Sequence, residues 1–432
     1  MSVSRRRILQ TAAFALARPA FGEPPSIAKL ESMRNRVRPI AMSERQARLE
    51  HARELMQQHK LDAMLLTGGS SLYYSSGARW GQSERFFSLL IPGKGESFCV
   101  CPSFEEGRAR EQLDRGPLGG ARMLTWGEDE NPYQTLASGM RSMGLSTVTL
   151  GVDERSPFVF SDGIAKASPQ ITLASATLVT AGCRMLKSVH ELELMTIANQ
   201  ATLKVYEAVY KALTPGMTQQ QASALISAAY ARVGFRGEAS VEVGSSSALP
   251  HGSAAAQVIR EGQPVMLDDG CTVEGYNSDI TRTFIYGTAS DEMKRVFDIV
   301  KRAQKAAFEA ARPGVACQAV DVAARNVITA AGYGPGYKYF THRLGHGIGL
   351  DGHEWPYLVR GNALPLAAGM TFSDEPGIYL PGKFGIRLED GMYLTPDGAK
   401  LFTPPSESLA GCGKKCGDGK HIYLLTFEMS RI

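Results

Sequence analysis

The sequence predicts two domains: an α/β domain over residues 23–182 and an α+β domain over 183–410 that contains an internal duplication. The chain has 432 residues, which exceeds what one ordinary hydrophobic core holds. Helix-like and strand-like patterns alternate up to about residue 180, and this alternation is typical of an α/β domain. Beyond it, helix-ending signals recur at a fixed distance: Pro215 and Pro313 are 313 − 215 = 98 positions apart, and Gly234 and Gly332 are 332 − 234 = 98 apart.

The first domain begins with a helix over 43–59, for which Ser43 is the expected N-cap and Gln46 its capping-box partner. Apolar, strand-like runs follow at 61–67, 86–91, 97–102, 147–152 and 171–178. The second and third of these runs flank Pro-Gly-Lys-Gly, which predicts a hairpin. No chemical motif is concentrated in this domain.

The second domain begins near residue 182 with two capped helices. Ser188 and Glu191 form a capping box, Thr218 and Gln221 form another, and Ser290 begins the first helix of the repeat. Each half therefore reads as helix, Pro-Gly, helix and hairpin. Two such halves facing each other across a pseudo-two-fold axis would bring their hairpins together at the centre.

Each predicted hairpin carries a pair of carboxylates. Asp268 and Asp279 are equidistant from the bond between residues 273 and 274, and Glu375 and Glu389 are equidistant from Gly382. Residues placed in this way face each other across an antiparallel ladder, where two like charges repel unless a cation lies between them. Structural ion pairs of the two glutamates, with Arg387 for instance, are the alternative.

His346 lies between glycines and is the best nitrogen donor to add to these four acids. Such an oxygen-rich set suits hard or borderline divalent ions, with Mn²⁺ favoured over Co²⁺, Zn²⁺ or Fe²⁺, and it is poor for a thiolate-bound structural zinc. Four carboxylates are enough for two ions that share ligands, an arrangement in which a bridging water becomes a nucleophile. We therefore predict Asp268, Asp279, His346, Glu375 and Glu389 as metal ligands.

Five motifs, in this order, carry a resemblance to a known family: D-x-G from Asp268, S-D-I-T-R-T-F, G-H-G-I-G-L-x-x-H-E, D-E-P-G-I-Y and G-I-R-L-E-D. The chain resembles the creatinase/aminopeptidase P/prolidase metallopeptidases (family M24) over residues 184–409, and weakly before them. The resemblance implies the pita-bread fold for the duplicated domain and a creatinase-like fold for the first. It further implies two divalent metal ions and cleavage of the peptide bond before proline, as aminopeptidase P or as a prolidase.

The same resemblance implies roles around the metals. Glu375 would accept the proton of the attacking water, and His251 and His353 would hold the substrate carbonyl and stabilise the tetrahedral intermediate. His342 matches a substrate-pocket histidine. Arg387 suits either a substrate carboxylate or support of the metal ligands, because a planar guanidinium fits both.

Two other function classes remain beside the peptidase. One is a small-metabolite amide hydrolase or lyase on the same fold. The creatinase branch itself fits less well, because it lacks the metal ligands, and all five ligand positions carry suitable residues here. A binding protein with a dead site predicts eroded ligands, and none of the five positions is eroded.

The N-terminus predicts export, and the composition predicts neither nucleic-acid nor membrane binding. Residues 1–22 contain paired arginines, a weakly apolar stretch and small residues, as in a twin-arginine signal to the periplasm; a basic tail on a cytoplasmic protein is the alternative. The net charge is +4, and the first twenty residues hold four arginines and no other charge, so the mature chain has 4 − 4 = 0. No apolar run has membrane-spanning length.

The resemblance to the family also implies the partners: a peptide substrate, and further copies of the chain as a homodimer or larger homo-oligomer. The tail over 411–432 has no assigned role. It contains Cys412 and Cys416, which would form either a small disulfide or two free thiols.

Overall fold

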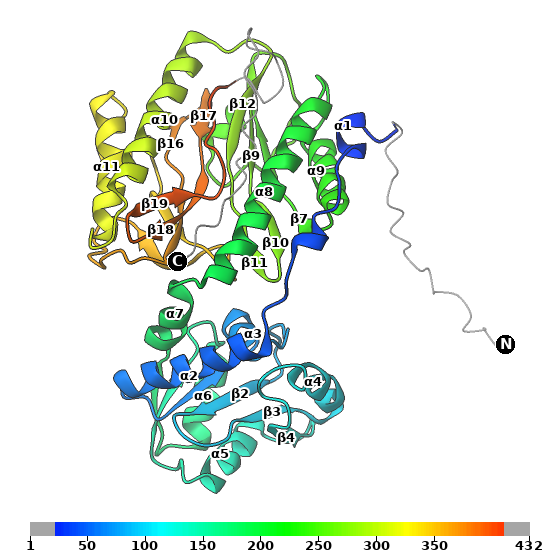
Figure 1. Cartoon of the computed structure of the whole chain (residues 1–432), viewed down its shortest axis with the longest axis vertical. Helices are drawn as coiled ribbons and strands as arrows, with labels where there is room; N and C mark the ends of the chain where they lie inside the picture. Colours follow the sequence, from blue (N-terminus) through cyan, green and yellow to red (C-terminus); the bar gives the residue numbers. More distant parts are fainter. Residues whose placement is uncertain (1–21, 410–432) are drawn as a thin grey trace, which may run out of the picture.

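Six strands form the mixed sheet of the first lobe in the computed structural model, which describes residues 22–409 (Figure 1). Their order is β4-β3-β2-β1-β5-β6, with β1 antiparallel to β2 and parallel to β5. The strands are β1 Ala63–Leu66, β2 Ser88–Pro92, β3 Phe98–Pro102, β4 Arg122–Trp126, β5 Thr149–Val152 and β6 Thr172–Ser175. The predicted hairpin is the β2–β3 pair.

Helices cover both faces of this sheet, because each face of it is apolar. One core contains residues of α2, α3, α4 and α7, and the other contains residues of α5 and α6. The helices are α2 Met42–Gln58, α3 Ser70–Ser76, α4 Glu106–Leu113, α5 Pro132–Ser142, α6 Phe158–Ala167 and α7 Thr177–Met185, with a 3₁₀ turn η2 at Ser103–Glu105. The predicted α/β class is therefore confirmed for this lobe.

Helix α2 begins one residue earlier than the sequence predicted, and its cap differs. The residue at the N-cap is Ala41, whose backbone N–H donates to the Glu44 carboxylate (2.8 Å). Gln46 instead donates to Glu50 (2.9 Å) on the exposed face. The Ser43/Gln46 capping box was wrong because Glu44 stands three positions after Ala41 and supplies the charged acceptor that the helix N-terminus favours.

The segment before α2 packs on the second lobe rather than on the first. Ile27, Met33 and Ile40 are buried in the core that contains the helices of the duplicated domain's first half. This segment holds α1 Pro25–Ala28 and the 3₁₀ turn η1 Arg34–Arg36. The predicted range of the first domain, 23–182, includes this segment, although it packs on the second lobe.

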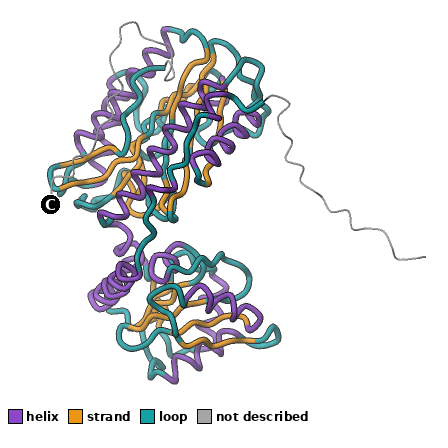
Figure 2. The backbone as a smooth tube through the Cα atoms, turned by 45° about the vertical axis from the view of Figure 1, so that its right-hand side comes forward, coloured by secondary structure: helices purple, strands orange, loops and turns teal. Residues whose placement is uncertain are grey.

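The second lobe is built from two halves that repeat helix, helix and sheet, as predicted. Helices α8 and α9 and the strands β8 and β9 share one core, whereas α10 and α11 and the strands β15 to β18 share another. Each half therefore has its own hydrophobic core, and the two halves meet along their sheets (Figures 1 and 2). The helices are α8 Val189–Ala212, α9 Gln219–Val233, α10 Asp291–Ala310 and α11 Cys317–Ala330.

Antiparallel strands make up the sheets of this lobe. In the first half they are β7 Arg236–Gly237, β8 Ser240–Val243, β9 Gln263–Asp268, β10 Cys271–Val273, β11 Tyr276–Asn277 and β12 Arg282–Tyr286, with a 3₁₀ turn η3 at Gly244–Ala248. In the second half they are β13 Gly345–Gly347, β14 Glu354–Leu358, β15 Thr371–Asp374, β16 Gly377–Leu380, β17 Phe384–Arg387, β18 Asp390–Thr395 and β19 Gly398–Leu401.

The register predicted for the second acidic hairpin is confirmed. Gly377 pairs with Arg387 and Asp374 with Asp390, so Glu375 and Glu389 fall opposite each other around Gly382. Gly382 has φ +75°, a left-handed value that glycine adopts without strain.

The register predicted for the first acidic hairpin was wrong, because the turn is centred one residue later in the chain than predicted. Val273 pairs with Tyr276, so the turn is made by Glu274 (φ +50°) and Gly275 (φ +91°). Two positive φ values are typical of the type I′ turn, which favours glycine at its second position. Asp268 and Asp279 are therefore not direct cross-strand partners, and they approach each other through a kink at Asp269, where φ is +125°.

Two predicted features lie at or beyond the limits of the described chain. The export segment 1–22 falls outside it except for its last residue, and the tail 411–432 with Cys412 and Cys416 falls outside it completely. Within the described residues, no helix combines the length and the apolar character that crossing a membrane needs.

Candidate metal centre

The five predicted ligands converge between the two halves of the second lobe. Asp268 ends β9, Asp279 lies between β11 and β12, His346 is in β13, Glu375 follows β15 and Glu389 lies between β17 and β18. Their donor atoms form overlapping groups within 4.8 Å: Asp268, Asp279 and Glu389; His346, Glu375 and Glu389; and Asp279, His346 and His353. Because the groups share members, six side chains form one continuous cluster.

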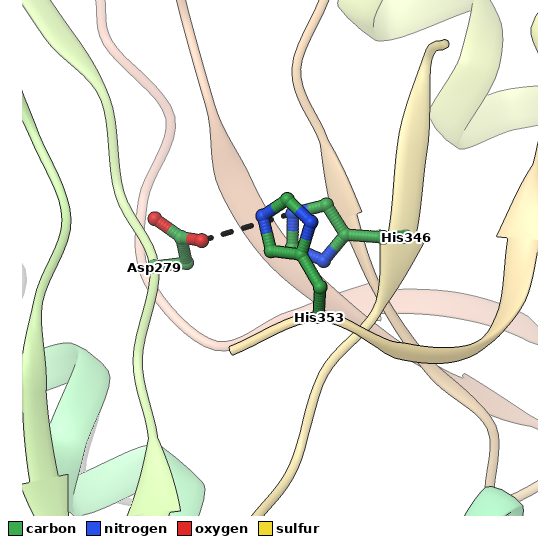
Figure 3. A group of neighbouring side chains, drawn as sticks. All are labelled: Asp279, His346 and His353. Atoms are coloured by element: carbon green, nitrogen blue, oxygen red, sulfur yellow. Dashed lines mark ion pairs between the residues drawn. The ribbon is translucent and has the colours of Figure 1, made fainter. Parts of the chain in front are cut away.

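His346 presents Nε2 to the acids. Its Nδ1 lies 3.1 Å from the Gly347 carbonyl oxygen, which can only accept, so Nδ1 carries a proton. Nε2 can then donate to Glu375 when it is protonated, and it offers its lone pair to a metal when it is not. Nε2 lies 3.2 Å from Glu375 Oε1. It also lies 3.8 Å from Asp279 Oδ2, as Figure 3 shows by a dashed line. Burial opposes a positive charge on this ring, but the two carboxylates nevertheless raise the pKa of His346. The site thus attracts a cation at Nε2.

Crowding of negative charge dominates the electrostatics. Burial, followed by the neighbouring Asp268 carboxylate, holds the pKa of Asp279 well above its usual range, and burial with Asp279 does the same to Glu389. Burial also opposes ionisation of Glu375, but the hydrogen bond from His346 and the charges around it lower its pKa to about 2. Carboxylates in one buried cluster at neutral pH need a positive charge among them.

Among the buried side-chain oxygens of the described residues that lack a hydrogen-bond partner, one belongs to the cluster, and it marks where a cation fits. Within residues 22–409, Glu389 Oε1 makes no hydrogen bond, whereas Glu389 Oε2 lies 2.7 Å from the Thr281 hydroxyl. An orphaned, buried carboxylate oxygen costs free energy unless it is bound. This orphan, four acids and one oriented imidazole together fit a pair of divalent ions that share ligands.

Hydrogen bonds of Arg387 and Thr281 hold the carboxylates of Asp268 and Glu389 in place. Nη2 of Arg387 donates to Asp268 Oδ2, and Nε donates to the Thr281 hydroxyl (3.0 Å). Its Nη1 donates to the carbonyl oxygen of Pro250 (2.9 Å) and the hydroxyl of Tyr379 (3.0 Å). Since four hydrogen bonds occupy this buried guanidinium, it can offer little to a substrate carboxylate.

The three other predicted histidines lie at different depths. The ring of His353 is exposed and stacks on His346, with 3.6 Å between the ring centroids (Figure 3). Partial burial and the charge of His346 lower the pKa of His353 to about 4, and His251, also exposed, acts on it in the same direction. His342 is held on both nitrogens, by the Arg343 carbonyl (2.8 Å) and the Tyr379 hydroxyl (2.7 Å), and its Nδ1 lies 3.8 Å from Glu375.

A pocket leads from the cluster toward the first lobe. Asp279 lines a pocket of about 200 Å³ together with Asp269 and Glu238. A second pocket of about 390 Å³ shares Thr272 and Asn277 with it and extends to residues of the first lobe: Gly69, Ser70, Tyr73, Arg79, Trp80 and Gly81. Asp279 of the acidic cluster thus borders a pocket on the side where the two lobes meet.

Sequence reasoning missed Thr281 and Tyr379. Thr281 lies two positions after Asp279 on the same strand path, so strand alternation was a signal for it. Tyr379 had no such signal, because its contacts to His342 and Arg387 depend on how the second hairpin folds over the site.

Comparisons with known proteins show which family the chain belongs to. Residues 193–396 match metallopeptidase family M24, and residues 48–186 match the creatinase/prolidase N-terminal domain. The chain is 38% identical to a probable dipeptidase PepE of Mycobacterium bovis, over 78% of this chain and 89% of that protein. It is 30% identical to a Xaa-Pro dipeptidase of Lactobacillus helveticus, over 84% of this chain and 98% of that protein.

Solved structures give the same result. The dipeptidase PepE from Mycobacterium ulcerans superposes with a TM-score of 0.80 at 34% identity, covering 86% of this chain and 99% of that one. A prolidase from Thermococcus sibiricus superposes with a TM-score of 0.77 at 30% identity, covering 85% and 98%. The acidic cluster, the duplicated lobe that carries it and these matches together establish that the chain is a member of metallopeptidase family M24, with a creatinase-type N-terminal domain and a pita-bread catalytic domain.

Proposed function

We propose that the protein hydrolyses the bond between an N-terminal residue and a following proline, in Xaa-Pro dipeptides or short Xaa-Pro peptides, with two divalent ions. One observation carries the proposal: overlapping groups of donors that share Asp279, His346 and Glu389. One ion would be held by Asp268, Asp279 and Glu389, and the other by His346, Glu375 and Glu389. When bound, the ions would supply Lewis acidity and lower the pKa of a water molecule.

Around those ions, Glu375 is the proton acceptor. Ser373 donates to Glu375 Oε1 (3.1 Å), and His346 approaches the same oxygen, which keeps the carboxylate ionised and oriented. An ionised, fixed carboxylate at this place can take a proton from the attacking water and return it to the departing amine.

His353 is the donor to the substrate carbonyl. Its pKa of about 4 makes the imidazole neutral at neutral pH, so it can donate one N–H to an oxyanion without placing a fixed positive charge beside the metal ligands. Its ring is exposed, so a peptide bound beside the cluster could reach it. His251 is proposed as a second group on that side, and His342 as support for Glu375 and Tyr379.

The proline preference is supported by the relatives named Xaa-Pro dipeptidase and prolidase. Mn²⁺ is proposed as the metal because carboxylates outnumber nitrogen donors in the cluster, which favours a hard or borderline ion.

The test is a hydrolysis assay of the purified chain with Mn²⁺, using Xaa-Pro dipeptides, Xaa-Pro-Yaa tripeptides and matched Xaa-Ala dipeptides. We expect cleavage of the proline substrates only, and a loss of about 10²–10⁴-fold in kcat for Glu375→Ala. Elemental analysis of the active protein should give two metal ions per chain. Turnover of a non-peptide amide, with no Xaa-Pro cleavage, would instead favour a small-metabolite hydrolase on the same fold.

Two further expectations belong to the whole protein in the cell. We propose export to the periplasm through the twin-arginine pathway, and assembly as a homodimer or larger homo-oligomer. Attaching residues 1–22 to a reporter and following its location tests the first, and light scattering of the purified chain tests the second.

A further inference from the structure

The loop that carries His353 is held by side chains of the N-terminal lobe. We propose that Arg155, from that lobe, is a positioning residue for catalysis, which fixes His353 by binding the backbone and the neighbouring carboxylate of its loop. The kinetic part of this inference rests on the hydrolysis proposed above.

Few contacts of its own side chain hold His353 in place. Its ring is exposed and is steadied on one face only, by stacking on His346. An exposed side chain that must meet a substrate oxygen needs its backbone fixed instead, because a misplacement of about 1 Å can cost about 10²-fold in rate.

Arg155 supplies that fixation with two hydrogen bonds. Its Nη2 donates to the His353 carbonyl oxygen (3.1 Å), and its Nη1 donates to Asp351 Oδ1 (3.0 Å). The planar fork of a guanidinium can make both bonds at once, which a lysine ammonium cannot do with the same geometry. One side chain of the first lobe therefore holds both the histidine and the carboxylate two residues before it.

Asp351, in the catalytic lobe, binds side chains of the N-terminal lobe. The Ser70 hydroxyl donates to Asp351 Oδ1 (2.5 Å), and Arg184 Nη2 lies 2.9 Å from Oδ2. Ser70 and Arg155 belong to the N-terminal lobe, and Arg184 lies in α7, which packs in that lobe's core. Three separate segments of the lobe thus converge on one carboxylate of the catalytic loop.

The other end of the loop is fixed by a buried ion pair. Lys187 Nζ lies 2.5 Å from Glu354 Oε1, and both side chains are almost completely buried. Gly349 allows this close packing, since a Cβ there would lie 2.4 Å from Glu354 Oε1 and 2.9 Å from Lys187 Cε. The loop 349–354 is consequently clamped at Glu354, and Arg155 restrains the exposed part that presents His353.

Arg155 is also a residue that can be changed without unfolding the protein. Its side chain is 49% exposed, whereas Arg184 is 6% exposed and its removal would take away the arginine that lies beside Asp351 Oδ2 and Glu354 Oε2. Arg85 is a matched control: it is a partly exposed arginine of the same lobe, and among the described residues its ion pairs are with Glu84 and Glu128 and not with the loop.

The kinetic experiment is a double-mutant cycle between Arg155→Ala and His353→Ala in the metal-loaded protein. We expect Arg155→Ala to lower kcat about tenfold with KM within twofold, because the loss is one of alignment. Arg155→Lys should recover only part of it, and Arg85→Ala should leave kcat unchanged. In the His353→Ala background, Arg155→Ala should have no further effect. A loss of the same size in both backgrounds, or unchanged kcat in Arg155→Ala, would overturn the proposal.

Hydrogen exchange separates this inference from the proposed function. Peptides covering residues 349–353 should exchange faster in Arg155→Ala than in the unaltered protein, with no change elsewhere in the catalytic lobe and with the same metal content. This readout needs no substrate, so it decides the inference even where no Xaa-Pro peptide is cleaved. Unaltered exchange in that loop would exclude a positioning role.

Discussion

Arg387 shows how one side chain serves several acids of the site. It is 5% exposed, and its hydrogen bonds tie Asp268 of the first acidic ribbon to Tyr379 of the second. A buried guanidinium has a large desolvation cost, which only several well-placed acceptors offset. Of the two roles that the sequence left open, support of the metal ligands is the one that these contacts favour.

We expect Arg387→Lys to lower the metal affinity by about 10–100-fold, because loss of an outer partner lets a ligating carboxylate move. A metal titration followed by calorimetry measures the affinity. Arg48→Lys is the control: Arg48 is also buried and binds Glu191 and Tyr276, away from the cluster. The control should lose stability but not metal affinity, and equal losses of affinity in the two variants would contradict the assigned role.

At the scale of elements, the register of the hairpin β16–β17 places Glu375 and Glu389 opposite each other, and the hairpin packs on its neighbour η3. A Cβ at Gly385 would lie 2.0 Å from the Ser247 carbonyl oxygen and 2.8 Å from Tyr379 Cδ1. The Ser247 carbonyl is backbone and cannot move aside as a flexible side chain can. The close approach of the hairpin to η3 therefore requires glycine at position 385. Gly382, at the tip of the same hairpin, has open space around its Cβ position.

These two glycines give a matched pair of variants. Gly385→Ala should push the hairpin away from η3 and lower kcat and metal affinity together. Gly382→Ala should destabilise the fold by about 1–2 kcal/mol, since its φ is +75° and a side chain is strained there, without a loss of kcat. Urea unfolding and steady-state kinetics of both variants check this. The explanation by close packing fails if Gly385→Ala keeps full activity.

At the scale of the whole molecule, the two halves of the catalytic lobe fold around separate cores and deliver their acids to a common boundary. Burial and mutual repulsion then raise the pKa values of Asp279 and Glu389 above those of the unfolded chain. A carboxyl with a raised pKa in the folded state binds its proton more tightly there than in the unfolded state. The stability linked to this proton is present below pH 4 or so and is lost as the pH rises toward the folded-state pKa.

Metal binding displaces these protons and should therefore depend on pH. We expect the increase in melting temperature on adding Mn²⁺ to be larger at pH 8 than at pH 5, as measured by differential scanning calorimetry. Asp279→Asn combined with Glu389→Gln removes both the protons and the ligands, so this variant should show no metal-dependent increase at either pH. A metal effect that is equal at both pH values would show that the acids are not protonated in the metal-free protein.

The sequence by itself determined the features that depend on neighbours along the chain. The Ser188, Thr218 and Ser290 caps form as predicted, because a cap needs only backbone N–H groups within three residues. The register around Gly382 follows from one tight turn. The five ligands could be named because local motifs carry them and because an oxygen-rich donor set indicates its own chemistry.

Tertiary structure decided what depends on segments distant in the sequence. The segment over residues 25–40, for example, packs on the lobe that follows the first in sequence. Arg155 and His353 are 198 residues apart, and nothing local to either one predicts that they meet. Sequence patterns describe which groups a site contains, whereas which donor satisfies which acceptor depends on how whole lobes dock.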